Sequence, residues 1–516
     1  MHLSVIPLIN TILSSFVNEP ADLTCPKVPI SVDTLTGSFP SGGLAQFPAN
    51  YDCGIDFKIP TGKVLKFKVR TEADEPGDKV VIRDSIGALN EFTSPSSVFY
   101  AAAEKATVWV KTESSSSSFH FTWEYIDVSG FTEIEKSFET FIPLNLTANH
   151  YYRFKSQTYT VYPQPITALA ASLSGGVDSS LKNIFVYDGE NLDSKFVGNL
   201  EQFLKNKTPK ITGRYLTLVN FYRLPSDSYL FVTDYSQYRN YDFVILSKDK
   251  PYRIKKTSTI KEHGVSPVTV FYCIDSNETY LTDLKFMNMT RENFRDYDQS
   301  VSFRLFSDEN PYYNKLYYRN YITRSYYSQR FDPKSLPQQI SSNAFTMELN
   351  QGEIEFELKS GPMEDYTKVM PGRKGKICSP SIWHQNGAAS YFANFTATET
   401  VKFVFTVENM KTIKPGEALL VEVGQPHSYS DPKFFKLTSR SYRKEAIGTY
   451  MAVTFTGTSE KSSFTLNYNV ESTHSSTSPH NREWGYSTSP HNREWGMNSS
   501  VSAGFSVLVL IVALIF

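Results

Sequence analysis

Three segments decide the fold of the first part of the chain: Val64-Leu65-Lys66-Phe67-Lys68-Val69, Thr107-Val108-Trp109-Val110-Lys111 and Phe119-His120-Phe121-Thr122-Trp123-Glu124-Tyr125. Apolar and polar residues alternate in each of them. Because successive side chains of a β-strand point to opposite faces, this alternation predicts antiparallel strands with one buried face. Turns rich in Pro, Gly and Ser separate the segments. Between residues 25 and 125 we therefore predict a small β-sandwich.

The composition extends this prediction to the whole chain. Its 516 residues are enough for about three to five domains at roughly 100–200 residues each. The 32 Tyr and 37 Phe beside nine Met favour aromatic-rich sheets, and no long segment combines helical spacing with caps. A net charge of −1 gives no electrostatic basis for binding nucleic acid. We predict an all-β chain without a nucleic-acid partner.

Further strand-like runs divide the rest of the chain. After a first sandwich at 25–127, we predict three more β-sandwiches at residues 131–245, 246–360 and 361–470. In the third of the four, Asn350-Gln351-Gly352 predicts the turn of a hairpin between strands at 344–349 and 354–358. Residues 471–498 are rich in Ser, Thr, Pro and His and repeat one ten-residue sequence. Such a composition cannot build a core and predicts a disordered stalk.

The two ends predict a protein held at the cell surface. Residues 1–17 are mostly apolar and are interpreted as a secretory signal peptide, with a misassigned start codon or a buried strand as alternatives. The apolar tail at the C-terminus is shorter than the roughly 20 residues of a transmembrane helix. With the small residues before it, this tail predicts a glycosylphosphatidylinositol (GPI) signal at 499–516, with Asn498 as the attachment residue. Ser499 or Gly496 are alternative attachment residues, and a short transmembrane anchor is the alternative to the lipid. The expected location is the outer face of the plasma membrane, including membrane rafts.

Secretion would place the four cysteines in an oxidising compartment, where an even count favours disulfides. Of the three connectivities, we expect the most local one, which pairs Cys25 with Cys53 and Cys273 with Cys378. The Asn-X-Ser/Thr sequons in the body of the chain predict N-glycosylation, at Asn145, Asn206, Asn277, Asn288 and Asn394.

Two motifs raise the alternative of a bound ligand. The sequence at 174–180, Ser-Gly-Gly-Val-Asp-Ser-Ser, matches the pyrophosphate loop of enzymes that adenylate substrates with ATP. That loop must follow a buried strand and open a helix. Because 168–173 make a poor strand and 181–186 look strand-like, we interpret the motif as a surface loop. The repeats around His480 and His491 share their spacing with the copper-binding repeat of the prion protein, and imidazole suits Cu(II). A duplicated linker is the alternative.

The first segment resembles the CUB-like domain family that is expanded in nematodes. The resemblance rests on Cys25-Pro26, on Tyr51-Asp52-Cys53 with the Ile-Pro-Thr-Gly turn after it, on Ile82-Arg83-Asp84-Ser85-Ile86-Gly87, and on the closing Phe-Thr-Trp-Glu-Tyr. Residues 131–245 are similar, more loosely, to ordinary CUB domains. The resemblance implies tandem jelly-roll β-sandwiches, a secreted or lipid-anchored setting, and a part in responses to pathogens. It implies no enzymatic activity.

Calcium is the cofactor that the resemblance raises, because many CUB domains hold it through acidic loop residues. Asp78 and Asp84 keep the spacing of two such positions. Calcium requires about six to eight oxygen ligands, and the sequence places no third carboxylate. Solvated turn carboxylates are the alternative, and we expect no cofactor.

These observations lead to one functional expectation. We expect a GPI-anchored, glycosylated surface protein that binds a protein or glycan partner, microbial ligands included, in innate immune defence. No short motif of a hydrolase or metalloenzyme occurs in the sequence. A passive epithelial coat protein, or a secreted enzyme or enzyme regulator with a non-contiguous site, are the alternatives.

Overall fold

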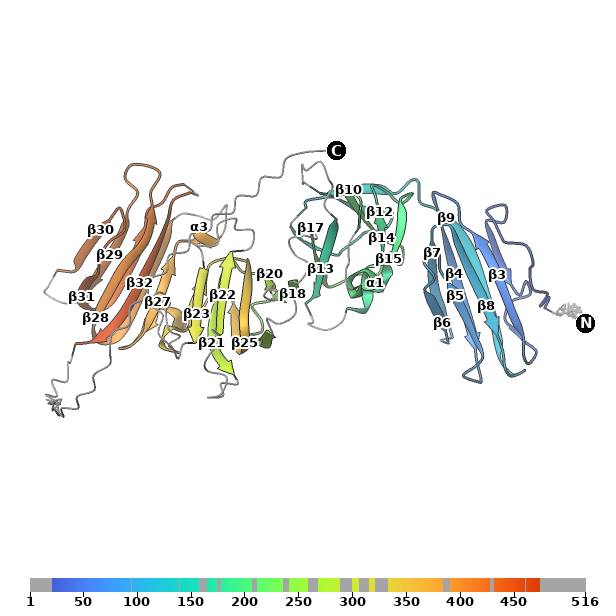
Figure 1. Ribbon diagram of the computed structural model, residues 1–516, viewed down its shortest axis with the longest axis horizontal. Helices are drawn as coiled ribbons and strands as arrows, with labels where there is room; N and C mark the ends of the chain where they lie inside the picture. The colour runs from blue at the N-terminus through green and yellow to red at the C-terminus, as the bar shows by residue number, and fades with distance from the viewer. Residues whose placement is uncertain are drawn as a thin grey trace, which may run out of the picture. The chain divides into compact units, whose positions relative to one another are not determined.

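A computed structural model describes the parts of the chain that are coloured in Figure 1. These are residues 21–93, 95–138, 140–156, 165–173, 178–206, 211–234, 241–258, 268–287, 299–305, 315–320, 333–383, 390–426, 431–459 and 461–473. All of them belong to one compact unit. The predicted signal peptide, stalk and GPI signal, with His480, His491 and Asn498, lie outside the described residues.

The first sandwich consists of two antiparallel sheets, drawn in blue in Figure 1. One has the order β1-β9-β4-β7, with β2 also paired to β9, and the other has the order β3-β8-β5-β6. The strands are β1 (Thr36–Phe39), β2 (Ala45–Gln46), β3 (Asp52–Lys58), β4 (Lys63–Glu72), β5 (Lys79–Arg83), β6 (Leu89–Phe92), β7 (Ser97–Ala102), β8 (Lys105–Lys111) and β9 (Ser118–Asp127). Alternate residues of β3, β4, β8 and β9 are buried, which confirms the predicted alternation.

A second pair of sheets follows, in green. The five-stranded sheet β10-β12-β16-β14-β15 shares a core with the three-stranded sheet β11-β17-β13. The elements are β10 (Thr132–Lys136), β11 (Phe141–Pro143), β12 (His150–Lys155), β13 (Ile166–Ser172), the 3₁₀ helix η1 (Ser179–Asn183), β14 (Ile184–Asp188), β15 (Lys195–Asn199), α1 (Leu200–Lys205), β16 (Tyr215–Asn220) and β17 (Ser228–Asp234). The expectation of a poor strand at 168–173 is wrong. Three alanines weaken its intrinsic preference, but pairing along all of β13 with β17 outweighs it.

The third group of strands is joined by one long strand. Its elements are β18 (Tyr241–Leu246), β19 (Tyr252–Ser258), β20 (Val268–Cys273), β21 (Thr279–Met287), β22 (Gln299–Leu305), β23 (Lys315–Asn320), the 3₁₀ helix η3 (Pro333–Ser335), β24 (Gln338–Ile340) and β25 (Ala344–Ser360). The hairpin predicted at Asn350–Gly352 is wrong, because β25 continues through it. Its first half pairs with β20 and β22, and its second half pairs with β19 and β21. Gly352, at φ +97°, provides the left-handed backbone at the transition.

The fourth sheet, in orange and red, has the order β27-β32-β28-β31-β29-β30, and β26 also pairs with β28. Its elements are the 3₁₀ helix η4 (Glu364–Thr367), β26 (Lys368–Val369), β27 (Lys374–Cys378), α3 (Pro380–Trp383), β28 (Tyr391–Lys411), β29 (Leu419–Gly424), β30 (Lys433–Leu437), β31 (Lys444–Phe455) and β32 (Ser463–Ser472). The 21-residue strand β28 pairs with β31 along its first part and with both β31 and β32 further on. The sheet thereby encloses its own core of aromatic and β-branched side chains.

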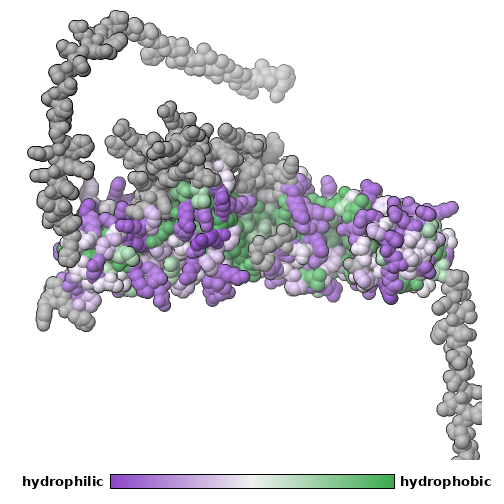
Figure 2. All heavy atoms as spheres, turned by 90° about the horizontal axis from the view of Figure 1, so that it is seen from below, coloured by the Kyte–Doolittle hydropathy of each residue, from purple (hydrophilic) through white to green (hydrophobic). Residues whose placement is uncertain are grey.

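Strands therefore dominate every described part, and the predicted all-β sandwich fold is confirmed. None of the described helices is long and apolar enough to cross a bilayer. On the face shown in Figure 2, hydrophilic side chains cover much of the described surface and leave smaller hydrophobic areas between them. Among the exposed apolar side chains, Phe392 and Phe434 are candidates for a binding surface.

Candidate binding site

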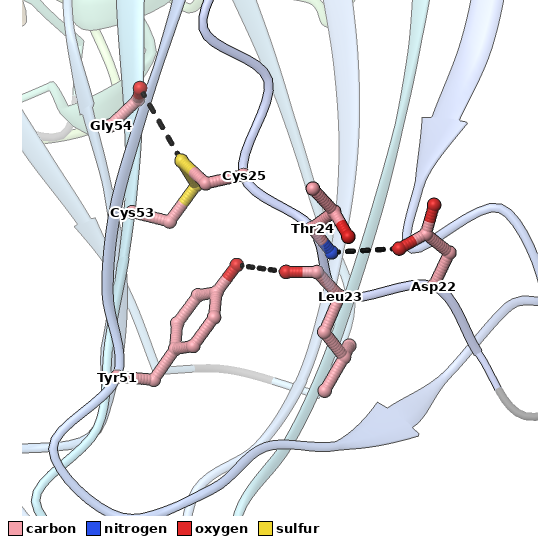
Figure 3. The surroundings of a disulfide bond; sticks show 7 residues. All are labelled: Asp22, Leu23, Thr24, Cys25, Tyr51, Cys53 and Gly54. Carbon is pink, nitrogen blue, oxygen red and sulfur yellow. Dashed lines mark hydrogen bonds between the residues drawn. A yellow bond between two sulfur atoms is a disulfide. The ribbon is translucent and has the colours of Figure 1, made fainter.

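A disulfide joins the segment before the first sandwich to strand β3 (Figure 3). Cys25 and Cys53 are bonded, with their Cα atoms 5.7 Å apart, and Cys53 is buried. The Tyr51 hydroxyl donates a hydrogen bond of 2.7 Å to the carbonyl of Leu23, which fixes the same segment a second time. This pairing confirms the first predicted bridge.

The second predicted bridge is absent, because Cys273 and Cys378 are free buried thiols. Both belong to the core of the third group of strands. The Cys273 thiol donates to a carboxylate oxygen of Asp275 at 3.4 Å. Burial raises the pKa of Cys378 to about 11. Burial raises the pKa of Cys273 as well, so both thiols are protonated at neutral pH. An even cysteine count was a misleading guide here.

Asp78 is a structural carboxylate at the start of β5. It is 1% exposed and accepts hydrogen bonds from the amides of Glu113 and Ser114 and from the hydroxyls of Ser114 and Ser117. Burial alone would raise its pKa, but these donors outweigh burial and lower the pKa to about 2. The carboxylate joins the β4–β5 turn to the β8–β9 loop, and its acceptor positions are occupied by protein donors.

Asp84 shapes a tight turn in the same sandwich. One carboxylate oxygen accepts the amides of Ile86 at 3.1 Å and Ala88 at 2.8 Å. Burial raises the pKa of Asp84. The described residues contain no group of three His, Cys, Asp or Glu side chains placed to hold a metal ion. Asp78 and Asp84 thus both accept protein hydrogen bonds within turns and loops, and calcium binding by them stays a prediction.

A cleft of about 750 Å³ lies between elements of the third group of strands and the fourth sheet. Segments that are far apart in the sequence form its walls: the turn before β21, the residues around β24, η4 and the start of β28. The lining contains both aromatic rings and side-chain amides, those of Asn277, Tyr280, Gln339, Tyr366, Tyr391, Phe392 and Asn394. Pockets of this size, with apolar walls and a few oriented polar groups, are typical ligand sites.

A chain of hydrogen bonds orients one wall of the cleft. The Gln339 side-chain amide donates to the Tyr280 hydroxyl at 3.0 Å, and that hydroxyl donates to a carboxylate oxygen of Glu278, also at 3.0 Å. Burial raises the pKa of Tyr280, so the phenol stays protonated. The Glu278 carboxylate is thereby held in a fixed direction at the cleft.

Tyr366 forms the aromatic floor. Its ring centroid lies 5.2 Å from that of Tyr280 and 5.5 Å from that of Phe395. Its buried hydroxyl has no partner within hydrogen-bond geometry in the described structure. Burial raises the pKa of the neighbouring Tyr391, against a lowering contribution from the Tyr366 hydroxyl. The hydroxyl groups of Tyr366 and Tyr391 therefore face each other beneath the cleft.

The charge of the lining narrows the chemistry of that guest. Glu278 and Glu364 are acidic, and none of the described lining residues is Lys, Arg or His. A phosphate or sulfate would meet carboxylates and no cation. Flat aromatic faces beside amides and carboxylates match a neutral polyhydroxylated molecule such as a sugar. The sequence did not reveal this cleft, because its residues share no local motif.

The first sandwich matches a known protein family. Residues 21–129 match the CUB-like domain family. This segment is a CUB-like domain. A comparison with curated protein sequences gave no match.

Solved structures that contain CUB domains are among the similar ones. The CUB1-EGF-CUB2 domains of rat MASP-1 match at 8% identity, with 44% of this chain and 99% of that chain covered and a TM-score of 0.16. The full extracellular region of zebrafish Gpr126/Adgrg6 matches at 9% identity, with 87% and 53% covered and a TM-score of 0.18. TM-scores below 0.5 do not define a common overall arrangement, so the fold rests on the strands of this chain.

Outside the CUB-like domain, the structure places the remaining predicted residues. The described sequon asparagines Asn145, Asn206, Asn277 and Asn394 are all exposed, whereas Asn288 lies outside the described residues. Asp178, from the motif at 174–180, caps the short 3₁₀ helix η1 and accepts hydrogen bonds from Ser180, Ser226 and Ser228. Residues 174–177 of this motif lie outside the described residues. In the described part after it, η1 leads directly into strand β14, without the α-helix that a pyrophosphate loop opens.

Proposed function

We propose that this chain is an extracellular, GPI-anchored and glycosylated protein that acts as a non-catalytic binding module. The observation that carries the proposal is the CUB-like domain at residues 21–129 with its Cys25–Cys53 disulfide. A disulfide that staples a β-sandwich is suited to an oxidising compartment. The exposed sequon asparagines agree with the same compartment.

The binding site that we propose is the cleft floored by Tyr366. Its ligand is a neutral glycan, and the biological setting is recognition of microbes in innate immune defence by a CUB-like protein of the type expanded in nematodes. Catalysis has no place in this proposal, because the cleft's carboxylates and phenols lack a partnered nucleophile. Neither calcium nor another cofactor is required.

Two measurements test the proposal. The first treats cells that express the full chain with phosphatidylinositol-specific phospholipase C, which should release the protein if its anchor is GPI. Protein that stays on the membrane after treatment contradicts the lipid anchor.

The second measurement applies the secreted ectodomain to an array of microbial and mammalian glycans. Tyr280→Phe removes the hydroxyl between Gln339 and Glu278 without changing the ring, so we expect glycan binding to weaken about 10-fold, the scale of one well-placed hydrogen bond. Tyr252→Phe, in β19 and outside the cleft lining, is the matched control and should bind as wild type. A folded ectodomain that binds nothing on the array, or a Tyr280→Phe variant that binds normally, would leave the passive coat protein as the better explanation.

A further inference from the structure

The outer face of the fourth sheet carries apolar side chains that the described residues leave uncovered. Phe392 and Phe434 are each 69% exposed, and Leu420 is 38% exposed. The alternate residues of β28, including Phe395, point to the opposite side and pack in the core. The exposed phenylalanines are therefore not part of the core.

The strand register places these side chains on two neighbouring rows. Phe392, Thr454 and Leu420 follow one another across β28, β31 and β29 in the first row. In the second row, Asn394, Ala452, Glu422 and Phe434 follow one another across β28, β31, β29 and β30. With strands about 4.8 Å apart, Phe434 lies about 14 Å from Asn394, and Leu420 lies about 10 Å from Phe392. Asn394 and Phe392 are the β28 members of the two rows. Both also belong to the lining of the cleft described above, so a glycan on Asn394 would border that cleft.

The sequon at Asn394 presents its residues on this same face. Phe392, Asn394 and Thr396 are all exposed, as residues i, i+2 and i+4 of one strand must be. Two residues along an extended strand span about 6.8 Å, so the first sugar on Asn394 would lie directly beside the Phe392 ring. The position of a glycan is thus set by the strand itself.

We propose that Asn394 carries an N-linked glycan whose first N-acetylglucosamine packs on the Phe392 ring and whose core covers the apolar outer face toward Leu420. This inference rests on the extracellular location proposed above. In the transfer, the Asn394 side-chain nitrogen bonds to the anomeric carbon of a lipid-pyrophosphate-linked oligosaccharide. The bond from that carbon to the pyrophosphate oxygen breaks, the lipid pyrophosphate leaves with the electron pair, and the amide gives up one proton.

The chemistry of the face fits such a glycan. The C–H face of a pyranose can cover an aromatic ring while its hydroxyls remain in water. The Tyr450 hydroxyl donates a hydrogen bond of 2.6 Å to the Glu422 carboxylate and holds it in place on this face. Lys436 stands next to Leu420 in the register and offers a donor to sugar hydroxyls. The other described sequons differ: Asp275 stands two residues before Asn277, and the Asn145 side chain accepts the Tyr152 hydroxyl at 2.8 Å.

The test expresses the full chain in eukaryotic cells and measures occupancy of each sequon by mass spectrometry after enzymatic glycan release in heavy-oxygen water. Asn394→Gln and Thr396→Ala each remove the glycan, and Thr396→Ser keeps the sequon. We expect Asn394→Gln and Thr396→Ala to lower the thermal midpoint of the fourth sheet by about 2–4 °C, the shift typical of losing one packing contact in a domain of this size. Both variants should also bind more of a hydrophobic dye. Thr396→Ser should match wild type. Trimming to a single N-acetylglucosamine should keep the thermal midpoint and raise dye binding.

Controls separate this packing from a general effect of glycosylation. Asn277→Gln, which removes a glycan with no aromatic residue two positions earlier, should leave the midpoint unchanged. In a Phe392→Ser background, Asn394→Gln should have no further effect. Equal shifts for Asn277→Gln and Asn394→Gln, or an unoccupied Asn394 beside occupied Asn145 and Asn277, overturn this inference alone. A chain with no sugar at any sequon overturns both it and the extracellular location.

Discussion

Replacing Asp78 tests how a buried carboxylate stabilises the CUB-like domain. Asp78→Ala would leave the Glu113 amide and the Ser117 hydroxyl without their acceptor, and the latter side chain is completely buried. A hydrogen bond to a charged group contributes about 1.5–3 kcal/mol. Counting only these two of the four bonds, the substitution should destabilise the domain by about 3 kcal/mol or more.

Asp78→Asn is the matched variant. Its carbonyl oxygen can still accept the two backbone amides, and its amide can donate to the Ser114 and Ser117 hydroxyls, which rotate to accept. We expect a smaller loss of about 1–2 kcal/mol. Hydrogen exchange of β5 and β8 peptides in the full chain measures both variants. About 3 kcal/mol corresponds to exchange on the order of 100-fold faster, and a change below about 10-fold for Asp78→Ala would refute the reasoning.

The pH dependence provides an independent check. The pKa of Asp78 is lowered from 3.8 to about 2, so its stabilisation is complete above the unfolded value and is lost as the pH falls through about 2. The free energy of unfolding of the wild type should therefore stay above that of Asp78→Asn from pH 7 down to pH 4. The difference between the two should shrink between pH 4 and pH 2, because the asparagine does not titrate. A constant difference across that range would show that the charge does not stabilise the fold.

Three further changes have defined outcomes. Removing the disulfide with Cys25→Ser and Cys53→Ser opens a loop of 28 residues, which should cost about 3.6 kcal/mol and appear as faster hydrogen exchange in β3. Cys273 and Cys378 should react with a thiol reagent only after denaturation, giving two thiols per chain without a reductant; zero thiols would restore the second bridge. Gly37→Ala should cost about 1–3 kcal/mol in thermal unfolding, because the added Cβ would overlap the indole ring that lies over it.

The sequence predicted the strands that have one buried and one exposed face. In β4, β8 and β9 one face is buried, so burial and composition alternate together. In β25 the pattern misled, since Gly352 signals a turn whether the chain reverses or, as here, moves from one set of partners to another. Strand β13 was missed because pairing, and not propensity, decides its conformation.

The candidate site was less predictable than the fold for a physical reason. Sequons and the Cys25–Cys53 pair are local signals, and the structure exposes the described sequon asparagines and joins the two cysteines. The cleft combines Tyr280 of β21, Gln339 of β24 and Tyr366 of η4. The long-range pairing of β21 with β24 and β25 brings these elements together. No spacing along the chain encodes that proximity.

Buried or partly buried carboxylates recur in three of the four strand groups, and their shared surroundings argue for a common role. Asp78, Asp178 and Glu417 each accept hydrogen bonds from backbone amides and from Ser or Thr hydroxyls of loops distant in sequence. The pKa of each of these three carboxyl groups is lowered. For Asp78 and Asp178, burial opposes the lowering. For Glu417, the hydrogen bond from the Thr458 amide is the largest cause of the lowering. A β-sandwich loop cannot satisfy all its amides through the ladder, and one carboxylate can satisfy several at once. Only the CUB-like domain has a disulfide among the described cysteines, so in the other two groups such carboxylates tie the loops without covalent bonds. Because the pKa of each carboxyl is lowered, these ties persist to a lower pH than those of an ordinary aspartate or glutamate, which releases its donors near about pH 4.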